Sequence, residues 1–194
     1  APASVDDGQA AALPVGAVTA LQALDMLTLE PGASRLILGA GGSVGRAAIQ
    51  LGRGRGLPVR ALVPEGEREG SRHRGADQAI DQSGDWSTQL QSSVDGALDL
   101  IGGEVLARSA GVLRPGGRAV TTVADSMSAP VAASLSMAYL RMRSTTADLA
   151  AVAAHVDAGE LTMPVRVRLP VEDVDGALAD VEAGLEHGKH VLEF

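Results

Sequence analysis

The sequence predicts an α/β protein of three layers, in which helices cover both faces of a mainly parallel, twisted sheet. Short apolar runs alternate with segments of helical periodicity along most of the chain. A glycine-rich turn joins the first of these runs to the helix that follows it. With 45% hydrophobic residues, the 194-residue chain can bury a core. Alternating strands and helices are typical of a parallel sheet, because each crossover places a helix against one face of the sheet.

The composition excludes several classes of function. The formal net charge is −8, from 24 acidic and 16 basic residues, so no positive field is available to hold a nucleic acid. No apolar run approaches the roughly 18 residues that a membrane helix needs, and we expect no membrane partner. Without cysteine there are no disulfides, thiolate nucleophiles or sulfur-ligated zinc sites. The acidic N-terminus lacks the order of a signal peptide, which predicts a cytoplasmic protein.

Residues 1–32 are predicted to form a helical lead-in. Apolar residues follow helical spacing over residues 10–29, but Pro14 and Gly16 interrupt the pattern. We therefore expect a short helix, a break and a longer helix that ends before Pro31.

Residues 33–160 carry the alternating pattern of one domain. Strands are expected at residues 35–39, 59–63, 78–80, 97–101 and 118–123. Helices are expected at residues 44–52, 103–113 and 146–157, with a polar helix or a loop at residues 66–74. In the last of these helices, Leu149, Val152 and Val156 are predicted to face inward.

Residues 161–194 are predicted to form a strand–helix–strand segment. Apolar residues alternate with arginine over residues 165–169, which is typical of a half-exposed strand. A helix is expected at residues 171–185 and a closing strand at residues 190–194.

The glycine-rich turn is the segment Gly39-Ala40-Gly41-Gly42-Ser43-Val44-Gly45. A strand that enters a helix through glycines lets the backbone approach a pyrophosphate, whose charge meets free N–H groups and the positive end of the helix. The hydroxyl of Ser43 adds a further donor. The alternative is a tight turn that needs glycine only for its backbone angles and close packing. The alternating context favours the first interpretation and predicts that residues 33–160 are a dinucleotide-binding domain.

The end of the second predicted strand decides between NAD and NADP, because a carboxylate there binds the ribose 2′-hydroxyl and repels a 2′-phosphate. Val63 stands at this position. Charged residues of both signs follow it, namely Glu65, Glu67, Arg68, Arg72 and Arg74. We predict NADPH as the cofactor in preference to NADH, with Arg68 as a phosphate contact. The alternative interpretation of these arginines is a solvated helix face.

Several short motifs occur in one order along nearly the whole chain. They are Val18-Thr19-Ala20-Leu21-Gln22-Ala23-Leu24, the glycine turn, Gly75-Ala76-Asp77, residues 99–103, residues 112–117 and Gly188-Lys189. Together they resemble the medium-chain dehydrogenase/reductase superfamily, in its quinone-oxidoreductase or enoyl-reductase branch. The resemblance implies a Rossmann fold that holds NADPH. It places Thr19 near the nicotinamide, residues 42–45 on the pyrophosphate, and Thr121, Thr122 and Val123 against the cofactor.

The resemblance also implies a reaction, the transfer of a hydride from NADPH to an activated C=C bond of a small-molecule quinone or enoyl substrate. Four positions near the cofactor depart from the pattern of the superfamily. Ser43 replaces a usual glycine, Gln82 a usual tyrosine and Pro64 a usual serine, and Glu67 stands near a usual lysine.

Members of this superfamily carry a GroES-like catalytic domain before the Rossmann part, and residues 161–194 resemble the segment that returns to it. No such domain is present in these 194 residues. We therefore expect either the cofactor-binding part of a longer enzyme, inactive by itself, or a non-catalytic dinucleotide-binding or assembly module. Residues 131–140 are apolar and resemble a sheet edge that pairs across a two-fold axis, which predicts a homodimer.

The sequence identifies no catalytic residue. Hydride transfer needs no protein nucleophile, because the cofactor supplies the reacting carbon. The four histidines show no metal-binding spacing and are predicted to be solvated: His73, His155, His187 and His190. No metal site is expected.

Overall fold

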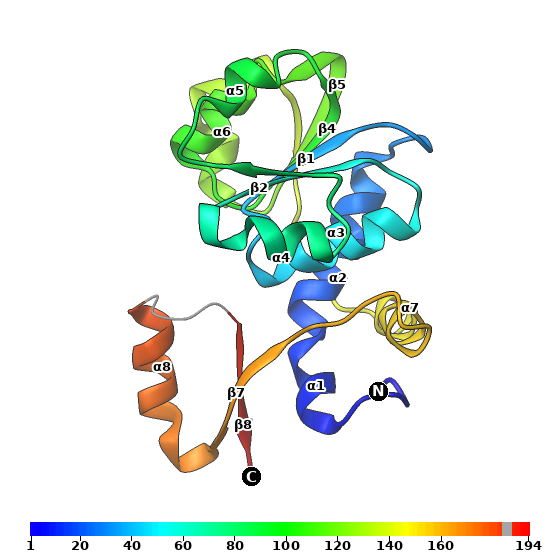
Figure 1. The fold of residues 1–194 in the computed structure, drawn as a ribbon, viewed down its shortest axis with the longest axis vertical. Coiled ribbons are helices and arrows are strands. Elements are labelled where there is room, and N and C mark those ends of the chain that lie inside the picture. The colour runs from blue at the N-terminus through cyan, green and yellow to red at the C-terminus, as the bar shows by residue number, and fades with distance from the viewer. Residues whose placement is uncertain (184–187) are drawn as a thin grey trace.

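A parallel sheet lies at the centre of the larger, upper part of the protein in the computed structural model, which describes residues 1–183 and 188–194 (Figure 1). Within that part of the chain the sheet has six strands in the order β3-β2-β1-β4-β5-β6, and every neighbouring pair is parallel. The strands are β1 (Arg35–Leu38), β2 (Val59–Val63), β3 (Gln78–Asp81), β4 (Val94–Asp99), β5 (Leu113–Thr121) and β6 (Ser136–Tyr139). The prediction of a Rossmann fold with a parallel sheet is confirmed.

Strand β1 lies at the point where the strand order reverses, between β2 and β4. Its three consecutive apolar residues are all completely buried, because they point alternately to two different cores. Ile37 belongs to one hydrophobic cluster, whereas Leu36 and Leu38 belong to the other. An unbroken apolar run is the expected pattern for a strand covered on both faces.

Helices cover both faces of the sheet. The bounds of the longer ones are α2 (Pro14–Leu27), α3 (Ser43–Gly54) and α7 (Thr146–Asp157), and the shorter ones are α4 (Arg68–His73), α5 (Trp86–Gln89) and α6 (Gly103–Ser109). Helices α2 and α3 pack against each other, and α7 packs against α2. Among the described residues, no helix is long and apolar enough to cross a membrane.

Several predicted ends of strands and helices were wrong, because a turn begins earlier than the apolar pattern indicates. The strand predicted over residues 97–101 ends at Asp99, because the Asp99 carboxylate accepts hydrogen bonds from the N–H groups of Ile101 and Gly102. The helix predicted over residues 103–113 ends at Ser109, and Leu113 instead begins β5 by pairing with Val94. Helix α5, whose Trp86 is buried in the second core, was not predicted from the sequence.

One predicted inward position in α7 was also wrong. Val152 and Val156 are buried, but Leu149 is 40% exposed. The first turn of α7 is held by polar contacts, since the Gln22 side chain donates a hydrogen bond to Asp148. Leu149 therefore stays at the surface beside this polar attachment.

A second, two-stranded sheet lies apart from the central one (Figure 1). Its parallel strands are β7 (Val165–Pro170) and β8 (Lys189–Glu193), with α8 (Val174–Glu182) between them in sequence. Alternate residues of β7 are exposed, as the alternation of arginine and apolar residues predicted. The predicted helix over 171–185 begins as a 3₁₀ turn, and its end at Leu185 lies outside the described residues.

The helical lead-in contacts this small sheet. Helix α1 (Asp7–Ala12) packs against β7 and β8. The Arg168 guanidinium of β7 donates to both carboxylate oxygens of Asp6 at 2.7 and 2.6 Å. The break predicted between the two N-terminal helices is confirmed and falls at Leu13, whereas Gly16 continues α2. Four 3₁₀ segments complete the described elements: η1 (Glu65–Glu67), η2 (Ala124–Ser128), η3 (Pro130–Ser134) and η4 (Val171–Asp173).

Candidate functional site

The glycine turn connects the carboxyl end of β1 to the first turn of α3, at the reversal point of the sheet. Gly39 has a φ of +83°, a region that favours glycine. A Cβ on Gly45 would lie 2.4 Å from the Cα of Ala40, so only glycine lets the helix start so close to the strand. A Cβ on Gly42 would meet nothing closer than 3.7 Å. The fold therefore requires Gly39 and Gly45, whereas it leaves space beside Gly42.

The start of α3 offers unpaired backbone donors at this turn. The N–H groups of Ser43, Val44 and Gly45 belong to the first helical turn, in which no carbonyl of the same helix is available to them. Gly42 is the residue before the helix and has no side chain that could cap it. Over the 12 residues of α3 the backbone dipoles add to a partial positive charge at this end. These features fit the diphosphate of a dinucleotide.

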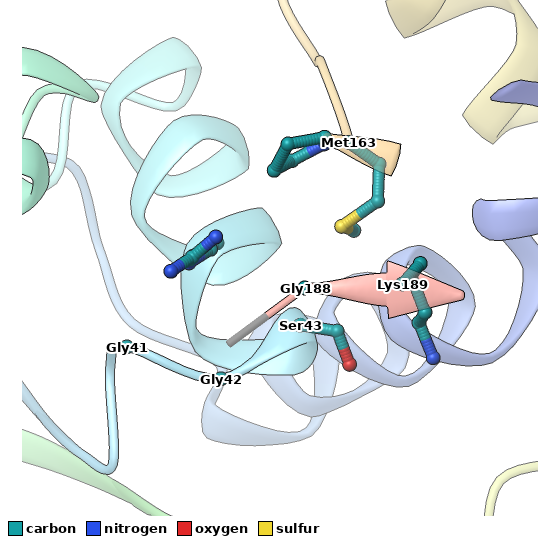
Figure 2. A pocket seen from close by; sticks show the side chains of 8 residues that line it. Gly41, Gly42, Ser43, Met163, Gly188 and Lys189 are labelled. Atoms are coloured by element: carbon teal, nitrogen blue, oxygen red, sulfur yellow. The ribbon is translucent and has the colours of Figure 1, made fainter. Parts of the chain in front are cut away.

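A cavity of about 180 Å³ lies between this turn and the small sheet (Figure 2). It is lined by Gly41, Gly42, Ser43, Arg46, Met163, Pro164, Gly188 and Lys189. In Figure 2 the side chains of Ser43 and Lys189 extend to the same side, next to the turn. Arg46 and Lys189 were not predicted as site residues from the sequence, although Lys189 is the only lysine in the chain. Both add positive charge at a place that suits an anion.

The residues predicted at the nicotinamide end lie at the carboxyl edge of β5. Thr121 is the last residue of that strand and is completely buried, and its hydroxyl donates to Asp99 Oδ2 at 2.7 Å. The Val123 N–H donates to Thr121 Oγ1, and the Thr122 N–H donates to the Asp99 carbonyl. The side chain of Thr121 is thus used internally, while Thr122 and Val123 remain half-buried at the sheet edge.

Asp99 organises this edge of the sheet. It is completely buried, and its carboxylate accepts four hydrogen bonds. Two come from the loop after β4, from the N–H groups of Ile101 and Gly102, at 3.1 and 2.8 Å. The other two come from the hydroxyls of Thr121 and Ser126, at 2.7 and 3.0 Å. Asp99 therefore ties the loops after β4 and β5 together beside the glycine turn.

Thr19 lies on α2, one turn after Gly16, whose backbone packs against Ser43. The Thr19 hydroxyl donates to the Val15 carbonyl at 2.6 Å. The fold thus brings the helix that carries Thr19 to the glycine turn, although its hydroxyl has a partner within the same helix.

The adenosine end differs from the arrangement expected for Arg68. The Arg68 guanidinium donates to Glu65 at 2.7 Å and to the Ala79 carbonyl at 3.1 Å. The residue that reaches the glycine turn is Glu67, whose Cγ would lie 3.4 Å from a Cβ on Gly41. Glu67 forms an ion pair with Arg46 at 2.9 Å and another with Arg74 at 3.9 Å.

Comparison with known proteins relates the chain to oxidoreductases. The family described as "Zinc-binding dehydrogenase" matches residues 74–192. The chain is 39% identical over 118 residues to the spectinabilin polyketide synthase system protein NorB of Streptomyces orinoci, covering 58% of this chain and 5% of that protein. It is 39% identical over 110 residues to the mitochondrial NAD(P)H oxidoreductase RTN4IP1 of Bos taurus, covering 53% of this chain and 28% of that protein.

A solved structure extends the similarity to nearly the whole chain. The quinone oxidoreductase of Coxiella burnetii superposes with a TM-score of 0.90 at 25% identity, over 98% of this chain and 62% of that one. The chain thus spans less than two thirds of the length of each of these three relatives.

The described residues do not fit a zinc ion, which the family description mentions. Among them there is no group of three or more His, Cys, Asp or Glu side chains placed to bind a metal. His155 hydrogen-bonds Glu160 at 2.7 Å, and His187 lies outside the described part of the chain. The prediction that His190 is solvated was wrong, since both of its ring nitrogens are buried without a hydrogen-bond partner in the described part.

Proposed function

This chain belongs to the zinc-binding dehydrogenase family, within the medium-chain dehydrogenase/reductase superfamily, and on that premise we propose that it binds NADPH for the reduction of activated C=C bonds in quinone or enoyl substrates. The observation that carries the proposal is the glycine turn. Its Gly42 faces open space, the first-turn N–H groups of α3 follow it, and Arg46 and Lys189 line the adjoining cavity. The similarity to an NAD(P)H oxidoreductase and to a quinone oxidoreductase supports the same function.

In this proposal the chain holds and orients the cofactor. Residues 42–45 contact the diphosphate through backbone N–H groups, and the Lys189 ammonium group balances its charge. Thr122 and Val123 border the nicotinamide end, where Asp99 fixes the loops. When bound, the cofactor supplies the hydride. A substrate wall that excludes water is supplied by the rest of a longer enzyme, so turnover by this chain alone is expected to be slow.

Titration of the chain with NADPH tests the proposal, with the fluorescence of NADPH and the melting temperature of the protein as the two measurements. Wild type should bind saturably and melt at a higher temperature, because a ligand of the native state stabilises it. Gly42→Ala should keep the fold, since its Cβ has space, but should weaken binding at least about tenfold by holding the diphosphate away from the N–H groups.

The matched control is Gly54→Ala, at the opposite end of α3, where a Cβ meets nothing within 4 Å. It should bind NADPH as wild type does. The proposal fails if neither NADPH nor NADH binds at millimolar concentration, or if both variants lose affinity equally. The glycine turn would then be purely structural.

The second candidate is a non-catalytic dinucleotide-binding or assembly module, favoured by the hydroxyls of Thr19 and Thr121, which are hydrogen-bonded within the chain. A reduction assay with quinone and enoyl substrates, on the longest natural polypeptide that contains this sequence, separates the two. Turnover with NADPH supports the reductase. Tight binding without any turnover supports the module.

A further inference from the structure

A cluster of two arginines and one glutamate lies at the adenosine end of the glycine turn. Arg46 projects from α3, Glu67 lies in η1 directly after β2, and Arg74 follows α4. Glu67 Oε1 is 2.9 Å from Arg46 Nη2, and Glu67 Oε2 is 3.9 Å from Arg74 Nη1. The methylene groups of Glu67 also pack against Gly41, as the 3.4 Å separation between Cγ and a Cβ placed on Gly41 shows. The carboxylate therefore occupies the space between the turn and two guanidinium groups.

The cluster has more donors than its single carboxylate can satisfy. The Arg46 side chain is 92% buried, and its Nε has no hydrogen-bond partner among the described residues. Arg74 Nη1 is likewise buried without a hydrogen bond in that part, since 3.9 Å is too long for one. Burial, and then the positive charge of Arg46, lower the pKa of Arg74, whereas Glu67 raises it. Two crowded cations with unused N–H groups favour an anion of higher charge than a carboxylate.

We propose that Glu67 holds the place of the cofactor's 2′-phosphate, and that NADPH binds by displacing Glu67 from Arg46 and Arg74. The inference rests on the proposed cofactor binding. The position is the one at which a Rossmann domain reads the 2′ group, after the second strand and beside the glycine turn. A phosphate monoester carries nearly two negative charges and three acceptor oxygens, so it can use the donors that Glu67 leaves unpaired. NADH carries only a 2′-hydroxyl at this place, which can donate a hydrogen bond to Glu67, or to the amide oxygen of a glutamine there, without displacing the side chain from the arginines.

This arrangement makes Glu67 a determinant of cofactor choice. In the absence of cofactor it compensates one of the two arginine charges, that of the buried Arg46. On binding of NADPH its displacement subtracts from the affinity. Removal of its charge should therefore strengthen binding of NADPH and leave binding of NADH nearly unchanged.

The experiment compares Glu67→Gln with wild type in calorimetric titrations of the full chain with NADPH, NADH, adenosine 2′,5′-bisphosphate and AMP. Glutamine keeps an acceptor for Arg46 and about the same volume, which favours retention of the fold. We expect affinity for NADPH and the bisphosphate to rise about tenfold, with less than a twofold change for NADH and AMP, since one charge-assisted competitor is removed. The matched control is Glu69→Gln, an exposed residue two positions later, which should change none of the four affinities.

Arg74→Gln provides a second variant. It should weaken the binding of NADPH and of the bisphosphate and leave the affinities for NADH and AMP unchanged. The inference is overturned if Glu67→Gln strengthens the binding of NADPH and of NADH equally, because the cluster would then contact the diphosphate that both share. It is also overturned if Glu67→Gln weakens the binding of NADPH or leaves the ratio of the two affinities unchanged. If wild type binds no dinucleotide at all, the proposed function fails instead.

Discussion

Replacement of Gly52 by alanine should destabilise the protein through a contact with a buried arginine. Gly52 lies near the end of α3, and a Cβ there would be 1.6 Å from Nη2 and 2.3 Å from Cζ of Arg35. Arg35 projects from β1 and is completely buried, with its Nη2 donating to the Leu57 carbonyl at 3.2 Å. The guanidinium group must move and lose this bond. We expect a loss of about 3 kcal/mol in the free energy of unfolding, from overpacking and an orphaned buried donor.

Arg35 is itself unfavourable for stability. Its Nε and Nη1 have no hydrogen-bond partner within the described residues. Burial, and then the nearby charge of Arg55, lower its pKa to about 10. A charge buried in this way costs stability, and its replacement by an apolar residue of similar volume often stabilises a protein by about 1 to 4 kcal/mol. Arg35→Leu should therefore stabilise the protein by about 2 kcal/mol.

The two substitutions together give the decisive result. In the Arg35→Leu background the guanidinium is absent, and Gly52→Ala should stabilise by about 1 kcal/mol through helix propensity. The sign of the Gly52 effect thus reverses between backgrounds, which urea unfolding of the four proteins would measure. If Gly52→Ala lowers the midpoint equally in both, the close approach of Arg35 to Gly52 is not the cause and the reasoning is wrong.

Two further predictions concern the edge of the sheet. Asp99→Ala should lower the free energy of unfolding in urea by about 3 kcal/mol or more and weaken binding of NADPH, because four donors, three of them buried, lose their acceptor. Asp99→Asn should cost less, and equal costs would contradict this explanation. We also propose that the chain is a homodimer through β6, the edge strand of the central sheet, which falls in the predicted segment at residues 131–140. Sedimentation equilibrium should give a dimer for wild type and a monomer for Tyr139→Lys, a 40% exposed position, and a monomeric wild type would refute the pairing.

The strands and the glycine turn were predictable from the sequence because their causes are local. Leu36, Ile37 and Leu38 are consecutive and apolar, so the strand they form is expected to be buried on both faces. Gly39 and Gly45 are required by a backbone angle and by contact with Ala40, both within a few residues. The ends of the elements were less predictable. Asp99 ends β4 because its carboxylate accepts hydrogen bonds from the next residues, and the hydrophobic periodicity contains no sign of these bonds.

The composition of the candidate site could not be read from spacing in the same way. Met163 and Lys189 line the cavity beside Ser43, although they lie far from it in the sequence. Arg68 was selected for its charge and its position after β2, but Glu65 and the Ala79 carbonyl hold it. The residue that reaches the turn is Glu67, which carries a negative charge where a positively charged side chain was expected.

The sequence by itself determined most of the strands and helices, the parallel sheet and the place of the turn that can face a diphosphate. Those features depend on periodicity and on backbone angles that neighbouring residues impose. Only the tertiary structure decided which charged side chains meet, because ion pairs such as Arg46 with Glu67 join separate elements across the sheet edge. The charge that surrounds a cofactor's 2′ position is therefore set by packing, and a list of nearby arginines and glutamates does not specify it.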